Sequence, residues 1–392
     1  MTPPPTPPPT PPVTYLDHAA SAPMRPEVAE AMAPFAAGWF GHPSSSHQVG
    51  RRARAALEEA RDVVADLLGA APGEVVFTAG GTEADNLAVL GVMGAAADRR
   101  PSTVVTSAVE HPAVWEPARA AARWMAGVDH RAAAVDGSGI VDLDRLDEVL
   151  HPQVALVSVM LANNEVGALQ PLAGVVARAR ELAPGAAVHT DAVQAAPWVD
   201  VAAAAAGCDL VSVSAHKLGG PKGAGALVVR EGTVLRPLVH GGGQERERRG
   251  GTHDVAGAVG LATALAVSAA GRAGEAARVR VLRDRLADGL VRAGAVESGR
   301  RDRVLPGHCH VRFPGIDQEE LLVLLDDAGV CASGGSACAS GALEPSRVMA
   351  AMGVGAAEGR GGIRLSLGWT TTAADVERAL AVVPAAAGKL AP

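Results

Sequence analysis

Short apolar runs alternate with longer stretches rich in Ala, Arg and Glu along most of the chain. Near-continuous apolar runs separated by helical stretches are typical of a mostly parallel β-sheet that helices cover on both faces. The runs predict buried strands at residues 75–78, 103–107, 154–160, 187–190, 210–214 and 226–229. The stretches between them predict helices at residues 51–68, 82–97, 112–126 and 172–182.

A second region follows this α/β pattern. A long helical stretch over residues 253–293 leads to shorter strand-like and helix-like segments. These segments, at residues 308–313, 318–328 and 362–366, predict a smaller α+β domain.

The pattern divides the chain into three parts. We expect a large domain over residues 14–260 and a small domain over residues 261–392, with residues 14–25 packed against the small domain. Residues 1–13 carry a Pro-Thr repeat and are expected to form an extended, disordered tail, either passive or a recognition ligand.

The composition narrows the class of protein. Of the 392 residues 48% are hydrophobic and 20% charged, which excludes wholesale disorder. A net charge of -7 and an aromatic content of 3% argue against nucleic-acid binding. The chain has no signal-peptide pattern and no uncharged run of about 18 apolar residues, so we expect a cytoplasmic protein that does not bind a membrane. Four cysteines without a C-x-x-C pair argue against a disulfide framework and against a metal site.

Lysine is almost absent. The chain has 35 basic residues, of which Lys217, Lys222 and Lys389 are the lysines and the rest arginine. Codon bias explains this average, but an amine can lose its proton and form a Schiff base, whereas a guanidinium stays charged. Each remaining lysine is therefore a candidate for chemistry that arginine cannot perform.

Two polar side chains follow predicted strands where ligands collect in parallel sheets. Lys217 ends the strand over residues 210–214 in the segment Ser214-Ala-His-Lys217, where a partly desolvated amine suits imine chemistry better than a phosphate or surface contact. Asp191 ends the strand over residues 187–190. A buried carboxylate there can pair with a protonated ring nitrogen, although an ordinary helix N-cap explains it as well.

Three further segments carry candidate chemistry. Gly80-Gly81-Thr82 joins a strand to a helix and forms either an anion-binding helix N-terminus or a plain tight turn. His111 lies between a strand and a helix that begins with proline, where it can stack on a planar group or transfer protons. Cys338 lies among small residues without an apolar period, which favours an exposed, reactive thiol. Together these residues predict a pyridoxal phosphate site.

The same residues stand in longer motifs, through which the chain resembles the cysteine desulfurases of the class V aminotransferase family, in the group with a long catalytic-cysteine loop. The resemblance extends from Tyr15 to Gly388. Its motifs are Gly41-His-Pro-Ser-Ser-Ser-His47, Phe77-Thr-Ala-Gly-Gly-Thr-Glu-Ala-Asp-Asn86, Asn163-Asn-Glu-Val-Gly167, Ser214-Ala-His-Lys217, Gly241-Gly-Gly243, Gly335-Ser-Ala-Cys338 and Leu343-Glu-Pro-Ser346.

The resemblance implies the fold of the fold-type I pyridoxal-phosphate-dependent transferases. Its large domain has a mostly parallel seven-stranded sheet, and a smaller α+β domain follows. The resemblance also implies that Lys217 holds pyridoxal phosphate through a Schiff base, with Asp191 on the ring nitrogen and Gln194 on the ring hydroxyl. His111 would stack on the ring and move protons.

Further roles follow from the resemblance. The cofactor phosphate would be bound by Gly81, Thr82, Ser214 and His216. Thr252 matches a residue that such enzymes lend to the partner subunit, which implies a homodimer.

The substrate contacts are implied in the same way. Asn164 and Arg364 would clamp the carboxylate of L-cysteine, a bidentate task that suits arginine. Cys338 would attack the substrate sulfur, which leaves L-alanine and an enzyme persulfide. An acceptor protein would then take the sulfur for iron–sulfur clusters, tRNA thiolation, DNA phosphorothioation or a thio-cofactor.

Other functions stay open at this point. A selenocysteine lyase or an aminotransferase would use the same scaffold, and an aminotransferase would not need Cys338. A catalytically silent scaffold or a dinucleotide-binding module is the alternative from a different class. Retention of both Lys217 and Cys338 argues against the silent scaffold.

Overall fold

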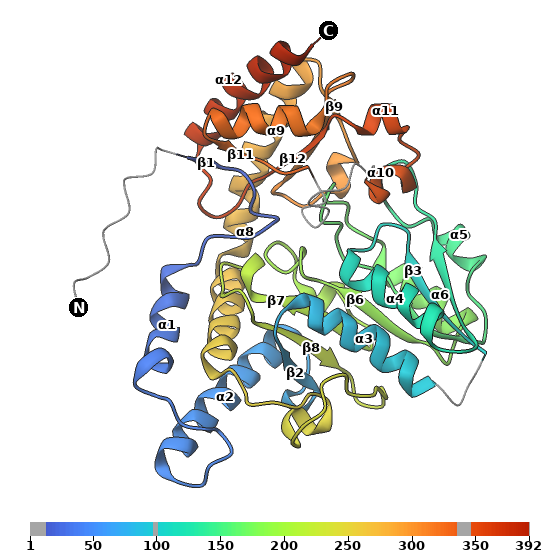
Figure 1. The fold of residues 1–392 in the computed structure, drawn as a ribbon, viewed down its shortest axis with the longest axis vertical. Coiled ribbons are helices and arrows are strands. Elements are labelled where there is room, and N and C mark those ends of the chain that lie inside the picture. The colour runs from blue at the N-terminus through green and yellow to red at the C-terminus, as the bar shows by residue number, and fades with distance from the viewer. Residues whose placement is uncertain (1–12, 97–100, 335–345, 392) are drawn as a thin grey trace.

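The computed structural model describes residues 13–96, 101–334 and 346–391. Its centre is a seven-stranded sheet with the strand order β2-β8-β7-β6-β5-β3-β4 (Figure 1). β8 runs antiparallel to β2 and β7, and the other neighbours pair in parallel. The strands are β2 (Val75–Thr78), β3 (Ser102–Ser107), β4 (Val128–Ala133), β5 (Val154–Ser158), β6 (Ala187–Asp191), β7 (Leu210–Ser214) and β8 (Gly225–Val229). The predicted fold class is therefore confirmed.

Both faces of this sheet are buried, which explains why its strands read as continuous apolar runs. Successive side chains of a strand point to opposite faces. Accordingly Val75 and Val211 pack into one hydrophobic cluster, whereas their chain neighbours Val76 and Leu210 pack into another.

Helices cover the two faces (Figure 1). The cluster that contains Val76 includes residues of α3 and α4, and the cluster that contains Val75 includes residues of α2, α6 and the first half of α8. The helices around the sheet are α1 (Pro26–Ala37), α2 (Gln48–Leu67), α3 (Gly81–Ala95), α4 (Pro112–Trp124), α5 (Leu143–Asp147), α6 (Leu172–Leu182) and α7 (Val201–Ala204).

A second hydrophobic cluster forms around an antiparallel sheet of three strands in the order β12-β10-β9. Beside it, β1 near the N-terminus pairs in parallel with β11, so the first described residues join this second core. Its strands and helices are β1 (Thr14–Tyr15), β9 (Val296–Glu297), β10 (His308–Arg312), β11 (Val330–Cys331), β12 (Gly362–Ser366), α9 (Gln318–Asp327) and α12 (Ala373–Leu390).

The 38-residue helix α8 (Val255–Arg292) connects the two cores. Leu261 packs in the first core and Leu286 in the second, so one continuous helix serves both. Its length and composition would suffice to cross a membrane, but these buried side chains make it a core helix. The domain boundary at residue 260 stays a prediction.

Two short helices follow residue 346. α10 (Arg347–Ala351) lies in the predicted small domain, yet its Val348 and Met349 pack with Val109 and Met160 beside the large sheet. α11 (Ala356–Gly359) comes next. Most of the predicted proline-rich tail and all of the segment around Cys338 lie outside the described residues.

Candidate active site

The carboxyl ends of the parallel strands bring the predicted site residues to one edge of the large sheet. Asp191 is the last residue of β6 and Ser214 the last residue of β7. Gly81 begins α3 after β2, and His111 lies between β3 and α4. Elements that are distant in sequence therefore place these polar groups together.

The turn before α3 packs closely and favours glycine at two positions. Gly80 has φ 131°, a conformation that favours glycine. A Cβ atom on Gly81 would lie 2.9 Å from Cγ2 of Val193 and 3.5 Å from Cβ of Ser214, so a side chain there would press against Val193. The glycines thus leave the backbone at the N-terminus of the 15-residue helix α3 bare beside Ser214. Backbone N–H groups and the helix dipole make such an N-terminus suitable for phosphate.

Thr82 and His111 line one groove of about 710 Å³ between α3 and α4. His111 is the N-cap of α4, and its Nδ1 accepts a hydrogen bond from Ala113 N at 3.1 Å. Burial, together with the charges of Lys217 and other nearby cations, lowers the pKa of His111 to about 4. His111 is therefore neutral at pH 7, so its ring can stack on a planar group and accept a proton.

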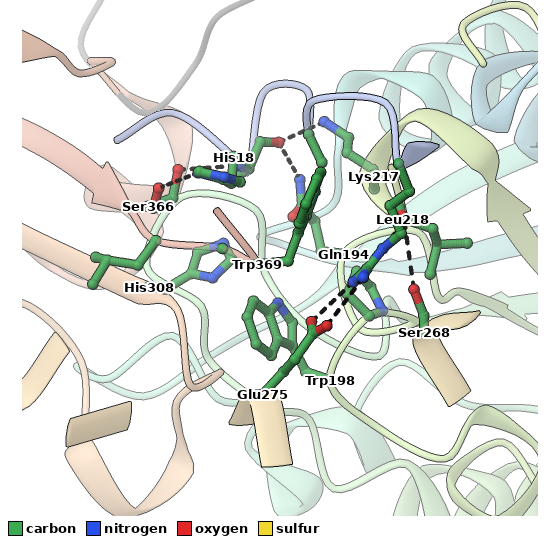
Figure 2. A pocket seen from close by; sticks show the side chains of 16 residues that line it. His18, Gln194, Trp198, Lys217, Leu218, Ser268, Glu275, His308, Ser366 and Trp369 are labelled. Carbon is green, nitrogen blue, oxygen red and sulfur yellow. Dashed lines mark hydrogen bonds and ion pairs between the residues drawn. The ribbon is translucent and has the colours of Figure 1, made fainter. Parts of the chain in front are cut away.

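Lys217 closes a short 3₁₀ turn (Ala215–Lys217) directly after β7. Its Nζ donates hydrogen bonds to Ala19 O at 2.5 Å and to Ala20 O at 2.7 Å. Gln194 Nε2 donates to the same Ala19 O at 2.7 Å, and Figure 2 shows the two dashed lines meeting at that oxygen. The segment before α1 thus lies across the amine of Lys217.

The segment before α1 also contacts His216, the residue before Lys217. Ala22 N donates to His216 O at 2.9 Å, and Nδ1 of His216 lies 3.4 Å from Oγ of Ser21. Burial lowers the pKa of His216 to about 4, and the charges of Lys217 and Lys222 add to the effect. The His216 ring is neutral at pH 7 and can donate one hydrogen bond.

Asp191 is a buried carboxyl group that can meet a cation. Its Oδ1 accepts a hydrogen bond from Val193 N at 2.8 Å. Burial raises the pKa of Asp191 to about 6, although the Val193 N–H and the charge of Lys217 act in the opposite direction. A protonated ring nitrogen beside Asp191 would favour the ionised carboxylate further.

Sequence reasoning missed two other buried acids near Asp191. Burial raises the pKa of Asp85 well above its ordinary range and that of Glu110 to about 8. His189 contacts Ser158 Oγ and Ser212 Oγ at 2.8 and 2.9 Å, and burial lowers its pKa to about 3. Uncharged neighbours of this kind leave Asp191 as the acid that ionises.

The structure brings the predicted carboxylate clamp together. Arg364 in β12 is 2% exposed, and its Nη1 donates to the backbone oxygen of Asn164 at 2.8 Å. Its Nη2 lies 2.8 Å from Oδ1 of Asp17, an acid that sequence reasoning missed. No local pattern marks Asp17, because its partner lies 347 positions away.

Two predicted site residues do not join this group among the described residues. Thr252 lines a separate cavity of about 110 Å³ with Thr78, Ala79 and Gly223. Cys338 lies outside the described residues.

Ser346 and Arg347 contact two loops near the large sheet. Ser346 Oγ donates to Glu165 Oε2 at 2.5 Å, and Arg347 Nη1 donates to Ala108 O at 2.5 Å. Sequence reasoning missed both contacts. Their acceptor residues are close to the predicted site in sequence, because Glu165 follows Asn164 directly and Ala108 lies three residues before His111.

The donor set fits an organic cofactor with a phosphate and a ring nitrogen. It combines an anion turn, a buried carboxylate, a neutral histidine and an amine at the strand ends. The described residues contain no group of three or more His, Cys, Asp or Glu that could hold a metal ion. This architecture is that of the fold-type I transferases.

Comparison with known proteins places the chain more narrowly. The family model of the class-V aminotransferases matches residues 14–379, so the chain belongs to this family. The IscS-like cysteine desulfurase of Mycobacterium tuberculosis is 46% identical over 391 residues, which cover 96% of this chain and 97% of that protein. The predicted family is therefore confirmed.

Solved structures agree with the family. A NifS-like protein has a TM-score of 0.90 and 34% sequence identity, and the match covers 96% of this chain and 100% of that one. SspA in complex with cysteine has a TM-score of 0.77 and 31% identity, over 90% of this chain and 98% of that one.

Proposed function

We propose that this protein is a pyridoxal-phosphate-dependent cysteine desulfurase, which converts L-cysteine to L-alanine and keeps the sulfur as a persulfide on Cys338. The observation that carries the proposal is the convergence of Lys217, Asp191 and the anion turn at Gly81 beside the carboxylate clamp of Arg364. The relatives named cysteine desulfurase support the same activity.

The residues present fit pyridoxal phosphate. The phosphate would lie at the N-terminus of α3, held by Gly81, Thr82, Ser214 and His216. Asp191 would face the ring nitrogen, Gln194 the ring hydroxyl and His111 the ring face, while Lys217 holds the aldehyde carbon. When bound, this cofactor supplies a conjugated, protonated ring that withdraws electrons from the substrate.

The chain's own residues orient the substrate and move its protons. Arg364, together with Asn164, fixes the carboxylate, which leaves the amino group and the sulfur to face the strand ends. The amine of Lys217 is within reach of two backbone carbonyls, which can hold it as an ammonium group once the substrate has taken its place. His111 is neutral and can accept a proton and return it.

Cys338 performs the sulfur transfer. Its thiolate attacks the sulfur of cysteine, so that an S–S bond forms as the C–S bond of the substrate breaks. The carbon fragment gains a proton and leaves as L-alanine. An acceptor protein then removes the terminal sulfur from Cys338.

We further infer that the enzyme is a cytoplasmic homodimer in which Thr252 reaches the phosphate of the partner subunit. Within one chain Thr252 lines a cavity that Lys217, Asp191 and His111 do not share, so it does not join their group in its own subunit. Among the described residues, Cys208, Cys309 and Cys331 are not in disulfides, as a reducing compartment requires.

The activity is tested by incubating the purified protein with pyridoxal phosphate, L-cysteine and a reductant. We expect equal amounts of sulfide and L-alanine. Cys338→Ala should keep the yellow colour and lose sulfide release, and Lys217→Ala should lose the absorbance of the bound cofactor. A keto-acid product that survives alkylation of thiols would identify an aminotransferase, and turnover of selenocysteine alone would identify a selenocysteine lyase.

A further inference from the structure

The segment before α1 supplies a carboxylate to the predicted substrate clamp. Nη2 of Arg364 lies 2.8 Å from Oδ1 of Asp17, while Nη1 donates to the backbone of Asn164. The Arg364 side chain is 2% exposed, so its charge needs an anion within the protein. Among the described residues, Asp17 forms an ion pair with it, and the Asp17 side chain is 19% exposed.

Hydrogen bonds hold the backbone around Asp17 against the strand that carries Arg364. Tyr15 Oη donates to Ser21 O at 2.7 Å and to Asp17 O at 3.1 Å, which closes the turn. Ser366 N donates to Leu16 O at 2.7 Å, and Ala19 N donates to Ser366 Oγ at 2.9 Å. Ser366 stands two residues after Arg364 on the same strand, which holds acid and arginine in register.

The Asp17 side chain can still turn toward water, because part of it is exposed. A substrate carboxylate offers the same two oxygen atoms to the same guanidinium. Exchange of one carboxylate for another keeps the buried charge of Arg364 balanced at every stage. A substrate without a carboxylate cannot take part in this exchange, since it would leave Asp17 in place.

We propose that Asp17 is the resting counter-ion of Arg364, which an incoming substrate carboxylate displaces, so that Asp17 sets the affinity of the site for α-carboxylates. The inference rests on the proposed function, because it takes Arg364 as the carboxylate clamp. The exchange also assists product release, as Asp17 returns to Arg364 when L-alanine leaves. The same segment holds the amine of Lys217 through Ala19 O and Ala20 O, so it contacts both cations of the site.

The test is Asp17→Asn in the cofactor-loaded, full-length protein. Removal of the competing charge should lower the KM for L-cysteine and the dissociation constant of L-alanine about tenfold, which corresponds to the loss of one charge-assisted hydrogen bond. L-Alanine binding is measured from the absorbance of the bound cofactor. The KM for cysteamine, which has no carboxylate, should stay the same. A structural role alone would lower activity on both substrates without this selectivity.

Asp209→Asn is the matched control. Asp209 is 25% exposed and pairs with Arg180 at 2.8 Å, but it precedes β7 at the opposite end from the site. We expect this variant to show no change in either constant.

An unchanged or higher KM and dissociation constant in folded Asp17→Asn would overturn the proposal. If that variant does not fold, Asp17→Glu keeps the charge but displaces it by one methylene, and the same two constants should fall by a smaller factor. No change in them would again overturn the proposal. A wild-type protein that releases no sulfide contradicts the proposed function instead, and L-alanine binding still tests Asp17 in that case.

Discussion

Replacing Glu245 with Gln is expected to cost about 3–5 kcal/mol of unfolding free energy, because it removes the buried counter-ion of the Arg61 guanidinium. Arg61 Nη1 and Nη2 donate to the two carboxylate oxygens of Glu245, each at 2.9 Å. Phe77 N donates to Oε2 at 3.1 Å, and Nε2 of His253 lies 2.9 Å from Oε1. The Arg61 and Glu245 side chains are 6% and 1% exposed, so water cannot replace the lost contacts.

Relief of backbone strain offsets part of this cost. Glu245, Arg246 and Glu247 have φ values of 47°, 54° and 65°, in the left-handed region. For residues other than glycine this conformation costs about 1–2 kcal/mol each. The hydrogen bonds of Glu245 hold the turn in place, so their loss allows the strained backbone to open.

The pKa of Glu245 gives an independent magnitude. Burial disfavours its ionisation, but the hydrogen bonds from His253 and Arg61 and the charge of Arg61 outweigh burial and lower the pKa from 4.5 to about 2. That difference corresponds to about 3 kcal/mol at about 1.4 kcal/mol per unit. Because the folded pKa is the lower one, this stability is fully present above about pH 4.5 and is lost as the pH falls toward 2.

The assay is urea unfolding followed by circular dichroism at several pH values. Glu58→Gln is the control, since Glu58 contacts the same Arg61 at 3.1 Å but is 51% exposed. It should lose less than about 1 kcal/mol. The gap in unfolding free energy between wild type and Glu245→Gln should be largest at pH 6–7 and should close as the pH falls from about 4.5 to 2. Equal losses in the two variants, or a gap that stays constant with pH, would refute the reasoning.

Three further predictions concern the site and its supports. Gly81→Ala places a methyl group in the anion turn and should weaken pyridoxal phosphate binding at least tenfold by fluorescence titration, whereas Gly94→Ala, later in the same helix, should not. Burial raises the pKa of Asp191 from 3.8 to about 6, so stability is lost as the pH rises from about 4 to about 6 and stays lost above that range. Asp191→Asn should therefore raise the Tm of the cofactor-free protein more at pH 8 than at pH 5, while cofactor affinity falls. Ser346→Ala removes the N-cap of α10 and should cost about 1–2 kcal/mol in urea unfolding, compared with little loss for the half-buried Ser138→Ala, whose hydroxyl caps no helix.

Most of the α/β framework was predictable from hydrophobic periodicity. The helix at residues 172–182 and the strand at 362–366 agree with α6 and β12 at both ends. Apolar side chains fill both faces of the central strands, and this pattern needs no knowledge of the partners. Strand β4 was missed because it lies at the edge of the sheet and carries polar residues such as Asp129 and Arg131. α1 and α12 were also missed, each of which has an internal proline.

The chemistry at the strand ends was partly predictable. Lys217 could be singled out because lysine is scarce in the chain, and Asp191 because an acid at the end of an apolar strand is unusual. Their tertiary surroundings could not be predicted. The uncharged state of His111, for example, depends on burial and on cations from three other parts of the chain.

The sequence by itself therefore determined most of the sheet and of its covering helices, the family and the candidate reactive groups, because these follow from local periodicity and short motifs. The tertiary structure alone decided which partners those groups meet. Asp17 meets Arg364 across 347 positions and Glu245 meets Arg61 across 184. The carbonyls that hold Lys217 belong to backbone that any residue could provide. Contacts of this kind leave no periodic signal, since they arise only when distant elements pack together.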